Sequence, residues 1–162
     1  MSVSSRGVLA AVAGIALAAL AAALVSQHVF DMQPCPWCVL QRLIFSFIAL
    51  FALLGLAWRA AAGQRTVGVG VLLLSVTGIA AVLWQHFVAA ASASCNLTLA
   101  DRIMSASGLP VLLPDVFEAR ATCADAAVSL LGVPYVLWAL ALFVLIAEIG
   151  RASCRERVYS SV

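Results

Sequence analysis

Four long apolar segments divide the chain, and each is close to the length that an α-helix needs to cross a bilayer. About 20 apolar residues span the hydrocarbon core, and the four segments cover residues 7–30, 39–58, 67–88 and 131–149. The first is longer than the roughly 7–15 apolar residues of a secretory signal core, so we expect it to be a retained anchor. The pattern predicts an all-α integral membrane protein. Its four-helix bundle, over residues 1–149, has a short external loop (31–38) and a long external loop (89–130) between spans three and four.

Composition supports a chain that lies in the lipid bilayer. Of its 162 residues 65% are hydrophobic and 10% are charged, whereas soluble domains carry about a quarter charged residues. The net charge of +2 is too small to indicate a nucleic-acid partner.

The arginines predict which way the helices run across the membrane. Cytoplasmic loops collect positive charge, and Arg6, Arg59 and Arg65 fall on one side of the predicted spans. The other side is mainly acidic, with Asp31, Asp101, Asp115, Glu118 and Asp125 against Arg102 and Arg120. We therefore expect both termini to be cytoplasmic and both cysteine-containing loops to be external. In a bacterium this means a multi-pass protein of the inner membrane with periplasmic loops, where disulfides persist.

The long loop contains its own apolar segment. Residues 100–107 are expected to form a short helix that ends at Gly108 and Pro110. The run 109–114 is apolar, contains two prolines and is too short to span a membrane. It is expected either to lie on the bilayer surface or to pack on the outer ends of the helices.

The cysteines carry the candidate chemistry. Cys35 and Cys38 form a Cys-Pro-Trp-Cys motif just before the second span, and Cys95 and Cys123 lie in the long loop. Zinc sites usually need two such motifs or paired histidines, and haem attachment needs a histidine where Val39 stands, so no metal site is predicted. Two purely structural disulfides remain an alternative, although so small a ring constrains the unfolded chain little. One close pair and one separated pair favour two redox couples at the membrane surface.

Cys38 is the member of the motif expected to face the membrane. It falls in the first turn of the second span, where unpaired backbone amides and the helix dipole stabilise a thiolate. Arg42 lies four residues later on the same helix face. An arginine inside an apolar span is a candidate functional residue. It is expected to stabilise an anionic sulfur or a reduced carrier, and the alternative is that it only reaches back to the interface.

These motifs resemble the DsbB family of disulfide-forming quinone reductases. The resemblance rests on residues 35–42 (CPWCVLQR), on Cys95 and Cys123, on the run 109–117 and on the Leu-Gly-Val-Pro sequence at 131–134 followed by Trp138. It implies an enzyme, a thiol:quinone oxidoreductase. Such an enzyme reoxidises a periplasmic DsbA-like, thioredoxin-fold oxidase and passes the electrons to a membrane quinone, ubiquinone or menaquinone, so that protein disulfides form.

The resemblance also implies a role for each site residue. Cys95 resembles the sulfur that the partner's thiolate attacks, and Cys123 is its couple. Cys35 resembles the residue that exchanges with the second-loop cysteines, and Cys38 the one that contacts quinone, with Arg42 binding beside it. His86, near the outer end of span three, is a further candidate for the quinone pocket, although a hydrogen-bonded interfacial anchor is the alternative; His28 is a weaker candidate of the same kind.

Other functions remain open at this point. One is a quinone-linked enzyme of another group, either like vitamin K epoxide reductase or dedicated to a single partner. In the former, the Cys-x-x-Cys motif would be expected late in the bundle, and here it precedes span two. Another is a non-catalytic membrane scaffold with two structural disulfides, which would leave Arg42 unexplained.

The C-terminal residues 150–162 differ from the rest of the chain. The segment 149–158 (IGRASCRERV) is abruptly polar and rich in arginine. The same ten residues result from translating a common sequencing-adapter sequence. Our hypothesis is that the natural reading frame is lost near Glu148 and that the tail is non-native. Its cysteine, Cys154, is therefore assigned no role, and a genuine cytoplasmic tail is the alternative.

The predicted orientation can be tested by cysteine labelling in intact cells. After reduction, a membrane-impermeant thiol reagent should label Cys95 and Cys123, because both lie in an external loop. A Gly63→Cys variant should be labelled only by a permeant reagent, because residue 63 lies in the turn that carries Arg59 and Arg65. Labelling of position 63 by the impermeant reagent would contradict the orientation.

Overall fold

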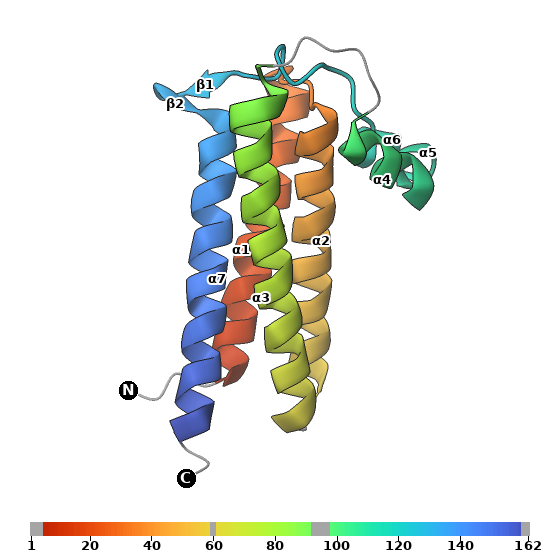
Figure 1. Ribbon diagram of the computed structural model, residues 1–162. Helices are drawn as coiled ribbons and strands as arrows, with labels where there is room; N and C mark the ends of the chain where they lie inside the picture. Colours follow the sequence, from red (N-terminus) through yellow and green to blue (C-terminus); the bar gives the residue numbers. More distant parts are fainter. Residues whose placement is uncertain (1–4, 59–60, 92–97, 160–162) are drawn as a thin grey trace.

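The computed structural model describes residues 5–58, 61–91 and 98–159, and of residues 5, 61, 62, 65 and 152–159 only the backbone. Arg59 and Cys95 lie outside the described residues. Four long helices run side by side (Figure 1): α1 (Ser5–Val29), α2 (Pro36–Ala57), α3 (Ala61–Trp84) and α7 (Tyr135–Tyr159). A π-helix, η1 (Gln85–Ala89), extends α3. α1 packs against α2 and α7, and α3 packs against the same two helices.

Within the described residues, three helices are long and apolar enough to cross a membrane: Arg6–Val29, Pro36–Ala57 and Thr66–Ala89. The three corresponding spans predicted from the sequence are therefore supported, and α7 is the further long helix at the C-terminal end. Both segments that carry the described cysteines lie at one end of this bundle, and the two termini lie at the other (Figure 1). We call the cysteine-bearing end the outer end.

All four long helices begin at residues other than those predicted: α1 at Ser5 and not at residue 7, and α3 at Ala61 and not at residue 67. The starts of α2 and α7 differ for local reasons. α2 begins at Pro36 and not at residue 39, because proline is favourable in the first turn of a helix and Cys35 acts as the N-cap. α7 begins at Tyr135 and not at residue 131, because residues 129–134 form a hairpin. Its strands, β1 (Ser129–Leu130) and β2 (Val133–Pro134), are antiparallel. The two turn residues, Leu131 and Gly132, have φ values of 55° and 78°, which is typical of a type I′ turn.

The long loop is mostly helical where the structure describes it. α4 (Leu99–Ser107) begins with a capping box between Thr98 and Asp101 and ends at Gly108, whose φ is 68°. The predicted short helix and its end are confirmed. The apolar run after it forms two single-turn helices, α5 (Leu109–Leu112) and α6 (Pro114–Phe117). All three lie beside the outer end of α2 (Figure 1).

Of the two expectations for this apolar region, packing on the outer ends of the helices is supported in part. Phe117 is buried, and α6 packs against α2. Val111, Leu112 and Leu113 remain exposed. Contact of these three side chains with the bilayer surface stays a prediction.

Close apolar packing holds the helices together just below the cysteine-bearing end. The rings of Phe45 (α2) and Phe143 (α7) stack at a centroid distance of 4.0 Å. Gly78 of α3 lies against the same Phe143 ring, and a Cβ atom there would be 2.4 Å from it. α3 and α7 can therefore approach this closely only because residue 78 has no side chain.

This packing predicts that Gly78→Ala destabilises the protein. The added methyl group overlaps an aromatic ring that is itself stacked on Phe45, and such overpacking costs about 1–3 kcal/mol. The measurement is unfolding of the purified protein in detergent. Gly14→Ala is the matched control, since nothing lies within 4 Å of a Cβ at that position. Equal stability of the two variants would contradict the packing of α3 on Phe143.

Candidate functional site

Cys35 and Cys38 lie together at the outer end of α2. Cys35 is the N-cap residue, and its sulfur accepts a hydrogen bond from the backbone N–H of Cys38 at 3.4 Å. The two Sγ atoms are 2.9 Å apart. The first turn of a helix has backbone N–H groups without helical partners, so this position stabilises negative charge on sulfur. The predicted place of Cys38 in the first turn of the second span is confirmed.

Cys123 joins this pair from the long loop. Its sulfur is hydrogen-bonded to the Cys35 thiol and to the backbone N–H of Trp37, in the first turn of α2. The chain just before it is fixed to the first loop, since the backbone N–H groups of Arg120 and Ala121 both donate to the Pro34 carbonyl, at 2.9 and 3.2 Å. Three of the four predicted cysteines therefore meet at one place, with Cys35 between the other two. The fourth, Cys95, lies outside the described residues.

The pKa values of Cys35 and Cys123 are shifted in opposite directions. The pKa of Cys35 is raised, chiefly because its thiol donates a hydrogen bond to the Cys123 sulfur, with contributions from Cys38 and from burial. The pKa of Cys123 is lowered because its sulfur accepts that hydrogen bond, although burial opposes the effect. Of these two thiols, Cys123 is therefore the more acidic. A thiolate is the nucleophile in disulfide exchange.

Cys38 has a second polar contact, from the π-helix. The side-chain amide nitrogen of Gln85 donates to Cys38 Sγ at 3.2 Å. The oxygen of the same amide accepts from Gln41 Nε2 at 2.6 Å. Both glutamines are buried, with 4% and 6% of their surface exposed. Sequence reasoning chose His86 and missed Gln85, although an amide inside an apolar span is itself a signal, because unpaired polar groups are costly there.

Arg42 is buried and holds several elements together. Its guanidinium donates to Gln27 Oε1 at 2.6 Å, to the Val116 carbonyl at 3.0 Å and to the Ala23 carbonyl at 3.1 Å. The side chain is 6% exposed, so it does not reach back to the water interface. It joins α1 to α6 across the outer end of α2.

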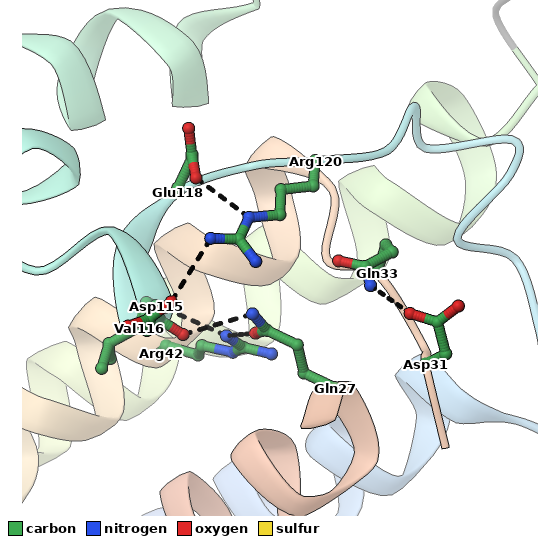
Figure 2. A network of polar contacts seen from close by, with 8 residues as sticks. All are labelled: Gln27, Asp31, Gln33, Arg42, Asp115, Val116, Glu118 and Arg120. Atoms are coloured by element: carbon green, nitrogen blue, oxygen red, sulfur yellow. Dashed lines mark hydrogen bonds and ion pairs between the residues drawn. The ribbon is translucent and has the colours of Figure 1, made fainter. Parts of the chain in front are cut away.

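Further polar contacts extend this network toward the surface. Gln27 donates to the Asp115 carbonyl at 3.2 Å. Arg120 forms ion pairs with Glu118 and Asp115, at 2.9 and 3.4 Å. Figure 2 shows the ion pairs above the pair of Arg42 and Gln27, with a separate contact between Gln33 and Asp31. The segment 115–121 is thus bound to the helices below it by backbone and side-chain contacts.

A cavity of about 750 Å³ opens beside Cys38. Its polar wall contains Cys38, Gln41, Arg42 and Gln85, and its apolar wall includes Ala19, Ala23 and Leu142 from α1 and α7. Tyr135 and Ser26, whose hydroxyl oxygens are 3.0 Å apart, join α7 to α1 at this cavity. A volume of this size suits a small organic ligand.

The two histidines lie elsewhere. His86 is half-buried, with its ring edge-on to Phe87 at a centroid distance of 4.9 Å, and does not line the cavity. His28 is exposed. In the described part of the chain, no group of three or more His, Cys, Asp or Glu side chains is placed to hold a metal ion. The roles of both histidines stay predictions.

Fold and site together define a helical protein with membrane-spanning segments and a thiol cluster at one end of its bundle. The family model of disulfide bond formation protein DsbB matches residues 5–150. The chain is 34% identical over 145 residues to disulfide bond formation protein B of Herminiimonas arsenicoxydans, covering 89% of this chain and 91% of that protein. The chain belongs to the DsbB family.

Other relatives give the same result. Disulfide bond formation protein B 1 of Pseudomonas savastanoi is 36% identical over 136 residues, covering 82% of this chain and 79% of the relative. Disulfide bond formation protein B of Ralstonia nicotianae is 34% identical over 149 residues, covering 91% and 92%. The resemblance noted from the motifs is confirmed.

Proposed function

We propose that the chain is a membrane thiol:quinone oxidoreductase of four spans, with α7 as the fourth, both termini in the cytoplasm and both cysteine loops in the periplasm. It reoxidises a periplasmic DsbA-like dithiol oxidase and passes the electrons to a membrane quinone. The observation that supports this best is the position of Cys35. It contacts Cys123 on one side and Cys38 on the other, so a disulfide can pass between the loops without a large movement.

The exchange then proceeds in two steps, and in each step one disulfide bond forms as another breaks. The partner's thiolate attacks Cys95 in a Cys95–Cys123 disulfide; a mixed disulfide forms, and Cys123 leaves as a thiolate. The Cys123 thiolate attacks Cys35 in a Cys35–Cys38 disulfide; the Cys35–Cys123 bond forms, and the electron pair of the broken bond goes to Cys38. The contacts of Cys35 with both Cys123 and Cys38 support this route.

The residues around the cavity fit a quinone. Cys38 lies at the wall, Arg42 and the two glutamines supply hydrogen-bond donors, and alanines of α1 leave room for a flat ring. When bound, a quinone supplies a lipid-soluble acceptor for two electrons and two protons. Arg42 would bind it beside Cys38. Whether the ligand is ubiquinone or menaquinone depends on the organism's lipid pool.

A scaffold with two structural disulfides is less well supported. A structural disulfide needs one partner for each sulfur, whereas Cys35 contacts two. The deciding experiment is anaerobic mixing of the purified protein with a reduced DsbA-like protein and a ubiquinone analogue. Loss of quinone absorbance, together with oxidation of the partner, is expected. A partner that stays reduced would overturn the proposed function.

Cysteine variants separate the two exchange steps. Cys95→Ser should abolish the mixed disulfide with the partner while Cys35–Cys38 still forms. Cys38→Ser should leave exchange with the partner detectable and stop net quinone reduction, because Cys35 then has no disulfide to break. The measurements are acid-trapped mixed disulfides on gels and quinone absorbance. Full quinone reduction by Cys38→Ser would show that another sulfur faces the acceptor.

Arg42 variants test the quinone contact. A hydrogen bond to a charged group contributes about 1.5–3 kcal/mol, so Arg42→Met should raise the apparent quinone KM by roughly tenfold to a hundredfold. Arg42→Lys should give a smaller rise, because an ammonium lacks the planar set of donors. Exchange with the partner should remain near normal in both.

The matched control for the Arg42 variants is Arg102→Met, on the exposed side of α4. Melting in detergent identifies variants that fail to fold. Unchanged quinone kinetics in folded Arg42→Met would limit this residue to joining α1 and α6.

A further inference from the structure

Gln85 is the side chain outside α2 that donates to the sulfur of Cys38. The hydrogen bond from its amide nitrogen is 3.2 Å long, and the residue also lines the cavity. A thiolate only accepts hydrogen bonds, and an amide NH2 group only donates them. The contact therefore strengthens when Cys38 carries negative charge.

Gln41 fixes the direction in which this amide points. Its own amide nitrogen donates to Gln85 Oε1 at 2.6 Å. With its oxygen bound to Gln41, the Gln85 amide presents its NH2 group to Cys38. Both side chains are buried, and a buried amide that lost its partner would leave a polar group unsatisfied, at a cost of about 1–3 kcal/mol. The pair is thus held in one orientation.

The backbone at Gln85 is also unusual. The α-helical pattern of α3 ends at Trp84, and Gln85–Ala89 is a π-helix. The Ala90 N–H bonds to the Gln85 carbonyl at 2.9 Å, which is an i→i+5 bond. Single-turn π segments inside α-helices occur often at functional sites. The wider turn sets the directions in which Gln85 and His86 point from the helix. Of these two residues, Gln85 lines the cavity and His86 does not.

We propose that Gln85 is a catalytic hydrogen-bond donor that stabilises Cys38 as the leaving thiolate, and that Gln41 is the residue that positions it. This inference rests on the proposed function. As Cys123 attacks Cys35, the Cys35–Cys38 bond breaks and its electron pair moves to Cys38 Sγ. Gln85 donates to that sulfur and keeps its proton. Because the donor is neutral, no permanent charge is added to a buried site.

Several titratable groups share this environment. Cys35 and Cys123 lie beside Cys38 at the outer end of α2, and Arg42 lies one turn deeper. Asp31, Arg120, Asp125 and Tyr135 line the same cavity. Uncharged variants of Gln85 and Gln41 leave Arg42, Tyr135 and the other charged groups in place, and the parent for the test lacks Cys35 and Cys123, so effects on Cys38 can be attributed to the amide pair.

The test is the pH profile of Cys38 alkylation in the quinone-free, full-length protein. The parent carries Cys35→Ser, with every other cysteine except Cys38 replaced by alanine. Gln85→Leu removes the donor. Gln85→Met removes it too, adds no charge and keeps an unbranched side chain. Both should move the profile to higher pH, with roughly tenfold to a hundredfold slower alkylation at a fixed pH on the rising part. Gln41→Leu should give a smaller shift in the same direction.

The matched control is Gln64→Leu, the same substitution near the other end of α3, which should leave the profile unchanged. Melting in detergent establishes that each variant is folded; if Gln85→Leu does not fold, Gln85→Met and Gln41→Leu decide the outcome. If the pH profiles of Cys38 alkylation in the folded variants coincide with that of the parent, the proposed role of Gln85 is overturned. The quinone assay on the native protein separates the two proposals. If the native protein reduces quinone but the alkylation profiles of the variants coincide, only the donor role of Gln85 is refuted. If the native protein does not reduce quinone, the proposed function is refuted, whatever the alkylation profiles show.

Discussion

The site depends on one backbone acceptor, the carbonyl of Pro34. It receives the N–H groups of both Arg120 and Ala121, which fixes the long loop to the short one and brings Cys123 to Cys35. Prolines on both sides of Cys35 restrict the short loop, because each fixes its own φ and keeps the residue before it extended. Cys35 accordingly has φ −85° and ψ 168°. A stiff first loop offers the second loop a fixed place to bind.

Polar contacts hold the outer end of the bundle, and apolar contacts hold the helices directly below it. At the outer end, Gln27, Gln41, Arg42 and Gln85 are buried and hydrogen-bonded to one another, to backbone carbonyls or to Cys38. Deeper in the bundle, the stacked Phe45 and Phe143 rings and the close approach of Gly78 hold α2, α3 and α7. A buried polar network is stable only when its members are satisfied. The apolar packing therefore supports the bundle, while the polar end sets the position of the sulfurs.

The sequence predicted the spans and much of the site, because both follow from local signals. Apolar length located α1, α2 and α3, and a Cys-x-x-Cys motif before a span placed Cys38 in its first turn. The late start of α7 was not predictable, since it depends on a hairpin that holds Leu131 at a positive φ, which non-glycine residues rarely adopt.

The choice of Gln85 over His86 was not predictable either, because it depends on side-chain direction. Adjacent helical residues point about 100° apart, and a π-helix changes that angle without a recognisable sequence signal. The contact of Cys123 with Cys35 joins residues far apart in the chain. It depends on hydrogen bonds to Pro34, which no spacing of cysteines indicates.

Arg42 and Gln85 act on Cys38 in different ways. The guanidinium is bonded to neutral oxygens of Gln27, Val116 and Ala23, so its contacts stabilise it without cancelling its positive charge. That charge stays in an apolar bundle one helical turn from Cys38, where electrostatic interactions are stronger than in water. The amide of Gln85 instead acts at contact distance and only along one direction. In the proposed exchange, Cys38 gains negative charge when the Cys35–Cys38 bond breaks, and both effects would favour that charge. A carboxylate bound to Arg42 would cancel the first of them.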